Sequence, residues 1–74
     1  MDPIQVDPEI LGGRPCFAGT RVPVKALFDY LTHGRPVDEF VADFPTVSRE
    51  QVVAVLDLAR RTLLATMAAA MPAA

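Results

Sequence analysis

The sequence predicts a mainly α domain in which a short N-terminal β-hairpin precedes three helices in helix-turn-helix order, the last of them long. Three observations carry this prediction. Short β-prone pieces between residues 4 and 24 are broken up by glycine and proline. Apolar residues take a helical period from Val24 onward. A complete set of helix-start signals surrounds Ser48.

The predicted hairpin pairs two short strands, Ile4 to Val6 and Pro15 to Phe17. The chain would reverse across the Asp7-Pro8 and Gly12-Gly13 steps. Two strands alone are only marginally stable in water. The hairpin therefore lies either on the helices or against a second copy of itself.

Each of the first two predicted helices has one apolar face. The face of the first follows the i, i+3, i+4, i+7 pattern and consists of Val24, Leu27, Phe28 and Leu31. Gly34 ends this helix as its C′ residue. The second helix runs from Val37 to Phe44 with acidic residues in its first turn, where they suit the positive end of the helix dipole. Pro45 forces Phe44 out of the α region and so stops it.

The third helix has the sharpest predicted start. Ser48 is its N-cap, and Gln51 can reach back to the backbone N–H of the cap, which makes a capping box. Val47 and Val52 can close a hydrophobic staple across the cap. The turn before this helix is as short as the turns in helix-turn-helix units.

The third helix shows no stop signal before Pro72. A helix over residues 49–71 would span roughly 35 Å, which exceeds what a core of this size can cover. Its rear is therefore predicted to contact another protein or a second copy in a homodimer, the alternative being a frayed alanine-rich tail. The predicted partner-binding residues are Leu63, Leu64, Met67 and Met71.

The chain thus divides into an arm over 1–23, a helix-turn-helix core over 24–60 and a helical extension over 61–74. Hydrophobic residues make up 51% and charged residues 22%, which is a globular rather than a disordered composition. The net charge of −2 and the pI of about 5.1 disfavour non-specific nucleic-acid binding, because such binding depends on neutralising phosphates. A basic face requires the fold to gather the few arginines.

Cys16 is the single cysteine, which excludes an intrachain disulfide and a cysteine-based metal site. The first residues lack signal-peptide features, and no apolar run approaches the roughly 20 residues of a membrane span. We therefore expect a cytoplasmic protein with no membrane contact. The sequence offers no nucleophile–base pair, phosphate-cradling loop or metal-ligand cluster, so we expect neither an enzyme nor a cofactor or metal.

Two separated motifs match one family. The first is a hairpin pattern with Asp-Pro, Gly-Pro and Gly-Thr-Arg steps, met by Ile4, Asp7, Pro8, Gly13, Pro15, Gly19, Thr20, Arg21, Val22 and Val24. The second is a glycine, two acids, an aromatic-Pro step and an apolar helix, met by Gly34, Asp38, Glu39, Phe40, Phe44, Pro45, Gln51 and Val52. Over residues 4–59 the chain resembles domain-of-unknown-function family 433, whose members look like VapB-type antitoxins. Pro36 departs from the pattern, which often has a capping serine there.

This resemblance implies a homeodomain-like helix-turn-helix behind a short hairpin. It also implies the antitoxin of a bacterial type II toxin-antitoxin system. Such a protein would neutralise a cognate PIN-like ribonuclease toxin, would bind operator DNA as a transcription regulator, and would act as a homodimer. The resemblance says little about residues 60–74, which lie beyond the usual motif.

If the resemblance extends to DNA binding, the helix that starts after Ser48 is the recognition helix, with its N-terminal residues in the major groove. Arg49 can grip guanine with two hydrogen bonds. Ser48 can lie close to a phosphate while it caps the helix, and Gln51 either reads adenine or is held in the capping box. The predicted phosphate contacts, which would position the domain, are Arg21, Lys25 and Arg35. Arg21 can instead tie its turn to a carboxylate or to helix-end carbonyls.

The alternative function is a protein-interaction or dimerisation module that keeps the helix-turn-helix shape without binding DNA. The acidic pI favours this alternative.

Overall fold

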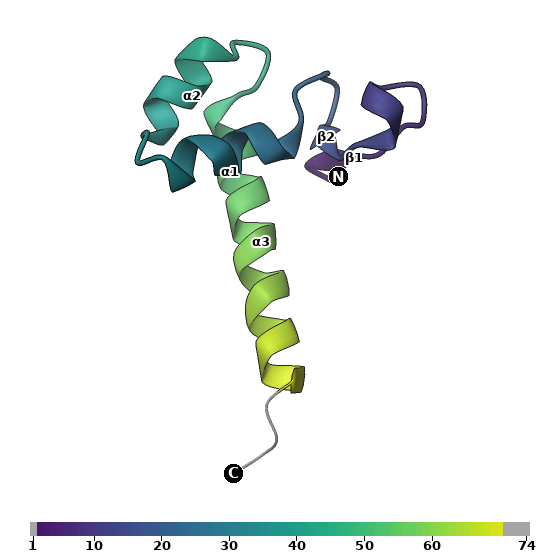
Figure 1. Ribbon diagram of the computed structural model, residues 1–74, viewed down its shortest axis with the longest axis vertical. Helices are drawn as coiled ribbons and strands as arrows, with labels where there is room; N and C mark the ends of the chain where they lie inside the picture. The colour runs from purple at the N-terminus through teal and green to yellow at the C-terminus, as the bar shows by residue number, and fades with distance from the viewer. Residues whose placement is uncertain (1, 71–74) are drawn as a thin grey trace.

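The computed structural model describes residues 2–70. Its elements in chain order are β1 (Ile4–Gln5), the 3-10 helix η1 (Leu11–Gly13), β2 (Cys16–Phe17), α1 (Val24–Thr32), α2 (Val37–Asp43) and α3 (Arg49–Ala70). The predicted mainly α fold, a hairpin followed by three helices, is confirmed. Figure 1 shows α3 running away from the other elements as a stem.

The hairpin lies on the helices, as in the first of its two predicted placements. β1 and β2 are antiparallel, with Ile4 opposite Phe17 and Gln5 opposite Cys16. Phe17 is completely buried and belongs to the same apolar core as the helices. The backbone carbonyl of Ala18 accepts a hydrogen bond of 2.9 Å from Gln51 Nε2 in α3. The arm is therefore held to the helical body by both packing and a hydrogen bond.

A tight turn after β2 brings the chain back to the start of α1. Gly19 has a φ of 76°, a conformation that a side chain disfavours. The hydroxyl of Thr20 donates to the carbonyl of Phe17 at 2.8 Å and accepts from the N–H of Val22 at 3.1 Å. These bonds leave the intervening residue, Arg21, exposed at the tip of the turn.

The buried face of α1 is centred on Leu27, which is completely buried. The prediction that Phe28 lies on the buried face is wrong, because its side chain is 36% exposed. Tyr30 takes the place beside α2 instead. Its ring lies 5.2 Å from that of Phe40 and 5.8 Å from that of Phe44, both edge-on. The other three predicted residues, Val24, Leu27 and Leu31, do belong to the core or pack against it.

The start of α3 follows the prediction in detail. Gln51 N donates to Ser48 Oγ at 3.1 Å, and Ser48 N donates to Gln51 Oε1 at 3.1 Å, so the capping box is confirmed. Val47 and Val52 on either side of the cap are both buried in the core. Phe44 leaves the helical conformation directly before Pro45, with φ −122° and ψ 75°. The beginning of α3 is thus fixed by hydrogen bonds and by burial at once.

Substituting the cap residue tests this arrangement. Ser48→Ala should lower the free energy of unfolding by about 1 kcal/mol, because the N–H of Gln51 loses its acceptor. Thermal and urea unfolding followed by circular dichroism measures the change. Thr66→Ala, which removes an exposed hydroxyl from the rear of the same helix, is the matched control and should leave stability nearly unchanged. Equal effects of the two substitutions would contradict the capping role.

Candidate functional site

The rear of α3 is a long exposed segment of the described chain. Every residue from 60 to 70 is exposed, although the segment is helical throughout. Leu63, Leu64 and Met67 are 61%, 57% and 50% exposed. The radius of gyration is 13.9 Å, against roughly 11 Å for a compact domain of this length. Three of the four predicted partner-binding residues therefore lie on a free helical ridge, and the fourth, Met71, lies outside the described residues.

Sequence propensity rather than packing keeps this rear segment helical. Alanine occupies positions 65 and 68–70, and alanine has the highest intrinsic helix propensity. Isolated helices shorter than about 12–15 residues are nevertheless marginal in water. A protein surface that covered the ridge would therefore both bury apolar area and stabilise the helix.

The front end of α3 is exposed, as the DNA-binding hypothesis requires. Ser48, Arg49 and Glu50 all face solvent. Both polar groups of the Gln51 side chain are occupied, since Oε1 accepts from Ser48 and Nε2 donates to Ala18. Of the two predicted roles for Gln51, the structure shows the capping box. No polar group of the Gln51 side chain is then left to form a hydrogen bond with adenine.

Arg49 forms an ion pair with Asp38 in the first turn of α2. It is the ion pair that joins two helices among residues 2–70. The other pairs lie within α1 or α3, or join α2 to Arg35 in the turn that precedes it. Sequence reasoning missed this partner, because it depends on how α2 and α3 are rotated relative to each other. The carboxylate of Asp38 would therefore compete with DNA for Arg49, the residue predicted to contact a base.

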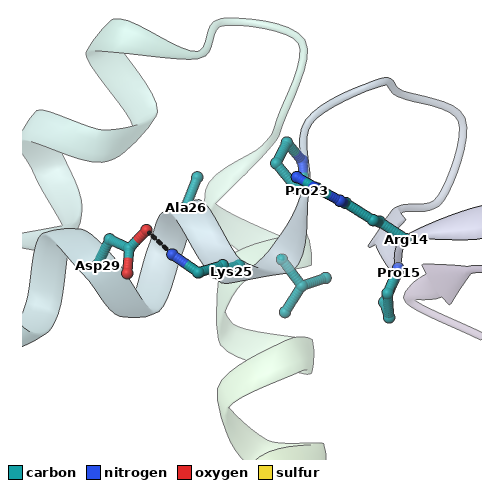
Figure 2. A pocket seen from close by; sticks show the side chains of 7 residues that line it. Arg14, Pro15, Pro23, Lys25, Ala26 and Asp29 are labelled. Atoms are coloured by element: carbon teal, nitrogen blue, oxygen red, sulfur yellow. Dashed lines mark hydrogen bonds and ion pairs between the residues drawn. The ribbon is translucent and has the colours of Figure 1, made fainter. Parts of the chain in front are cut away.

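Most of the other predicted cationic contacts are also paired. Lys25 lies 2.8 Å from Asp29, and Arg35 lies 3.5 Å from Glu39. A dashed line in Figure 2 marks the Lys25–Asp29 pair. Arg21 forms no side-chain hydrogen bond or ion pair within residues 2–70, so its predicted tie to a carboxylate or to helix-end carbonyls is absent there. Arg14, which sequence reasoning did not select, is likewise unpaired within the described chain. The two free arginines both lie on the arm.

Near the middle of α3, Asp57 binds two arginines of the following turn. Its carboxylate lies 2.9 Å from Arg60 Nη2 and 3.0 Å from Arg61 Nε. The hydrogen bond from Arg60 holds the pKa of Asp57 below its usual range. Together with Arg49, Lys25 and Arg35, these contacts neutralise five of the seven cations.

An open hollow of about 600 Å³ separates the arm from α1. Figure 2 shows residues that surround it: Arg14, Pro15, Pro23, Lys25, Ala26 and Asp29. Its wall is mostly apolar, and the Lys25–Asp29 pair lies at its edge. Among residues 2–70, no group of three or more histidine, cysteine or acidic side chains is placed to hold a metal ion. In the same part of the chain, no helix has the length and apolarity to cross a bilayer.

The family model described as "Protein of unknown function (DUF433)" matches residues 4–59, which is most of the chain. The chain belongs to the DUF433 family. This match spans the arm, α1, α2 and the packed first half of α3, and it ends where the exposed ridge begins. The predicted family membership is thereby confirmed, whereas the family description supplies no activity.

A solved relative supports the same fold. The chain is similar to a DUF433 member protein from Anabaena variabilis ATCC 29413, whose crystal structure was determined at 2.00 Å resolution. The TM-score is 0.71 and the sequence identity 31%, over 82% of this chain and 60% of that chain. No curated protein matches this DUF433 member.

Tyr30 links α1 to α2 beside the Arg35–Glu39 pair. Its hydroxyl donates a hydrogen bond of 2.7 Å to Asp43 Oδ2, and the guanidinium of Arg35 lies over its ring at 5.4 Å. The hydrogen bond to Asp43, followed by burial, raises the pKa of Tyr30 above its ordinary value of 10.0. Ionising the phenol removes this bond and places two negative charges side by side.

A spectroscopic titration tests this link directly, because Tyr30 is the single tyrosine and the chain has no tryptophan. We expect the tyrosinate absorbance of the DUF433 protein to rise with a midpoint above pH 10, and Asp43→Asn to move the midpoint downward. A raised folded-state pKa contributes stability that is complete below the unfolded-state pKa and is lost as the pH rises through the folded value. An unchanged midpoint in Asp43→Asn would show that the carboxylate does not act on the phenol.

Proposed function

We propose that this DUF433 protein is the antitoxin of a type II toxin-antitoxin pair. It would neutralise a PIN-like ribonuclease by binding, without catalysis, and the second half of α3 would be the binding element. The observation that carries the proposal is the exposed apolar ridge of Leu63, Leu64 and Met67 on a helix that nothing in the described chain covers. The family resemblance supplies the kind of partner.

The geometry of the ridge suits insertion into a groove. Apolar side chains spaced three and four residues apart on an amphipathic helix are the usual anchors for a hydrophobic groove on another protein. Leu63 and Met67 are four residues apart, so they lie one above the other on one side of α3. A toxin that bound this side would also stabilise a helical segment that the antitoxin's own core does not cover. Neutralisation would follow from occlusion of the toxin's cleft.

A double substitution on the ridge tests this proposal. Leu63→Asp combined with Met67→Asp should abolish co-purification with the cognate toxin and should restore toxicity on co-expression. The reason is that two carboxylates would have to be buried in an apolar contact. The arm, α1 and α2 should stay folded, because these positions make no contact with the core.

The matched control places the same two charges on the opposite side of the same segment. Successive residues are turned by about 100° around a helix, so Thr62→Asp with Ala65→Asp leaves the ridge intact. This control variant should still bind and neutralise the toxin. Loss of binding in both double variants, or in neither, would contradict a contact through the ridge.

Operator binding is a second candidate function, favoured by the exposure of Ser48 and Arg49 at the front of α3. The two unpaired arginines on the arm could contact phosphates from the side. The ion pair with Asp38 opposes this function, because Arg49 must leave that carboxylate before it can bind a base edge or a phosphate.

The Asp38–Arg49 pair makes operator binding testable by gel-shift titration with promoter DNA. Arg49→Glu should cost about 1–3 kcal/mol of binding free energy, and Asp38→Asn should tighten binding by releasing the arginine. Arg61→Glu, which changes net charge equally but lies three turns along α3, is the control. Binding should weaken steeply as salt is added. Equal affinities for all variants, or no binding at low salt, would leave protein binding as the whole function.

A further inference from the structure

The hollow between the arm and α1 is built on backbone that is fixed by hydrogen bonds. The N–H of Val24 donates to the carbonyl of Pro15 at 2.9 Å, and Cys16 pairs with Pro23 in an isolated antiparallel bridge. These contacts tie the end of the arm to the first turn of α1. Because proline has a locked φ and loses almost no side-chain freedom when it is covered, Pro15 and Pro23 form walls that are in place before any ligand enters.

The size and lining of this hollow suit a small molecule. Its volume of about 600 Å³ lies within the roughly 300–1,000 Å³ of ligand pockets, which are mostly apolar and carry a few polar groups that fix orientation. The apolar part of the wall consists of Pro15, Pro23, Val24 and Ala26. A ligand that fits here therefore has an apolar body.

The charged residues that line the hollow leave one positive charge unbalanced. They are Arg14, Lys25 and Asp29. Lys25 and Asp29 are 2.8 Å apart and neutralise each other. The side chain of Arg14 extends from the arm toward Pro23 (Figure 2), and no carboxylate within residues 2–70 pairs with it. The ligand of complementary charge is therefore a monoanion.

The geometry and charge of Arg14 favour a carboxylate over a phosphate. A guanidinium presents its donors as a fork that matches the two oxygens of a carboxylate. A phosphate monoester also fits this fork, but it carries about −1.5 to −2 charges at pH 7. That charge exceeds the one free cation of the hollow and would be repelled by Asp29 at its edge. A monocarboxylate balances Arg14 and leaves no surplus charge.

We propose that the hollow between the arm and α1 binds a small monocarboxylate with an apolar body. Its carboxylate pairs with Arg14, and its body lies against Pro15, Pro23 and Ala26. The bound molecule contacts both the arm and α1, so it stabilises the folded arrangement of the two. The rear of α3 takes no part in this site, and binding requires neither a toxin nor DNA.

Titration of the isotope-labelled full chain with phenylbutyrate, followed by two-dimensional NMR, tests the proposal. The amide signals of Arg14, Cys16, Val24, Lys25 and Ala26 should shift and saturate. Arg14→Gln should raise the dissociation constant at least about tenfold, since a hydrogen-bonded charge pair is lost. Unsaturated shifts, or an equal dissociation constant in Arg14→Gln, would overturn the proposal. Arg14 is exposed, so the variant should fold, and its spectrum without ligand verifies this.

Arg21→Gln is the matched control, because Arg21 is the other unpaired arginine of the arm and does not line the hollow. This variant should bind phenylbutyrate as the unmodified chain does. Phenylbutanol, which has the same body without the charge, should bind the unmodified chain more weakly than phenylbutyrate does.

Two further outcomes would overturn the proposal. Shifts centred on Leu63 and Met67 would show non-specific binding to the exposed ridge. Tighter binding of benzyl phosphate than of phenylbutyrate would make Arg14 a phosphate contact. Because the titration contains neither toxin nor DNA, its failure is separate from a failure of the proposed function.

Discussion

The start of α3 is the constraint on which the rest of the structure depends. Gln51 closes the capping box with Ser48 through Oε1 and ties the arm at Ala18 through Nε2. Val47 and Val52, buried on either side of the cap, fix the angle at which the chain enters the helix. One side chain thus joins the hairpin to α3, while the flanking valines join α3 to the core. The direction in which the stem leaves the body follows from this junction.

The small core then determines which part of α3 is available for binding. Val52 and Val55 are buried, Leu58 and Ala59 are half-buried, and every residue from 60 onward is exposed. The arm, α1 and α2 together cover only the first half of a 22-residue helix. A helix that extends so far beyond its own core exposes its apolar residues, and the proposed toxin interface uses this excess length.

Electrostatics separate the proposed toxin interface from the proposed DNA contact. Five of the seven cations are paired with carboxylates, and the front of α3 carries Glu50 beside an arginine that Asp38 already holds. Exposed ion pairs of this kind are worth little to stability. Their larger effect is to lower the positive potential that a phosphate backbone would meet. The same pairing does not hinder contacts made by leucine and methionine.

Features that are determined by a few neighbouring residues could be predicted from the sequence. Features that depend on how the helices are rotated relative to one another could not. The cap at Ser48 and the stop at Pro45 each follow from a few adjacent residues, and the exposed rear follows from helix length against core size. The Asp38–Arg49 pair and the substitution of Tyr30 for Phe28 in the packing depend on how α2 turns against its neighbours. The candidate site reflects this division. The exposed ridge could be predicted, because its exposure follows from the length of α3 and requires no contact with the rest of the chain. Which arginines form ion pairs could not be predicted, because this depends on which carboxylate the fold places beside each of them.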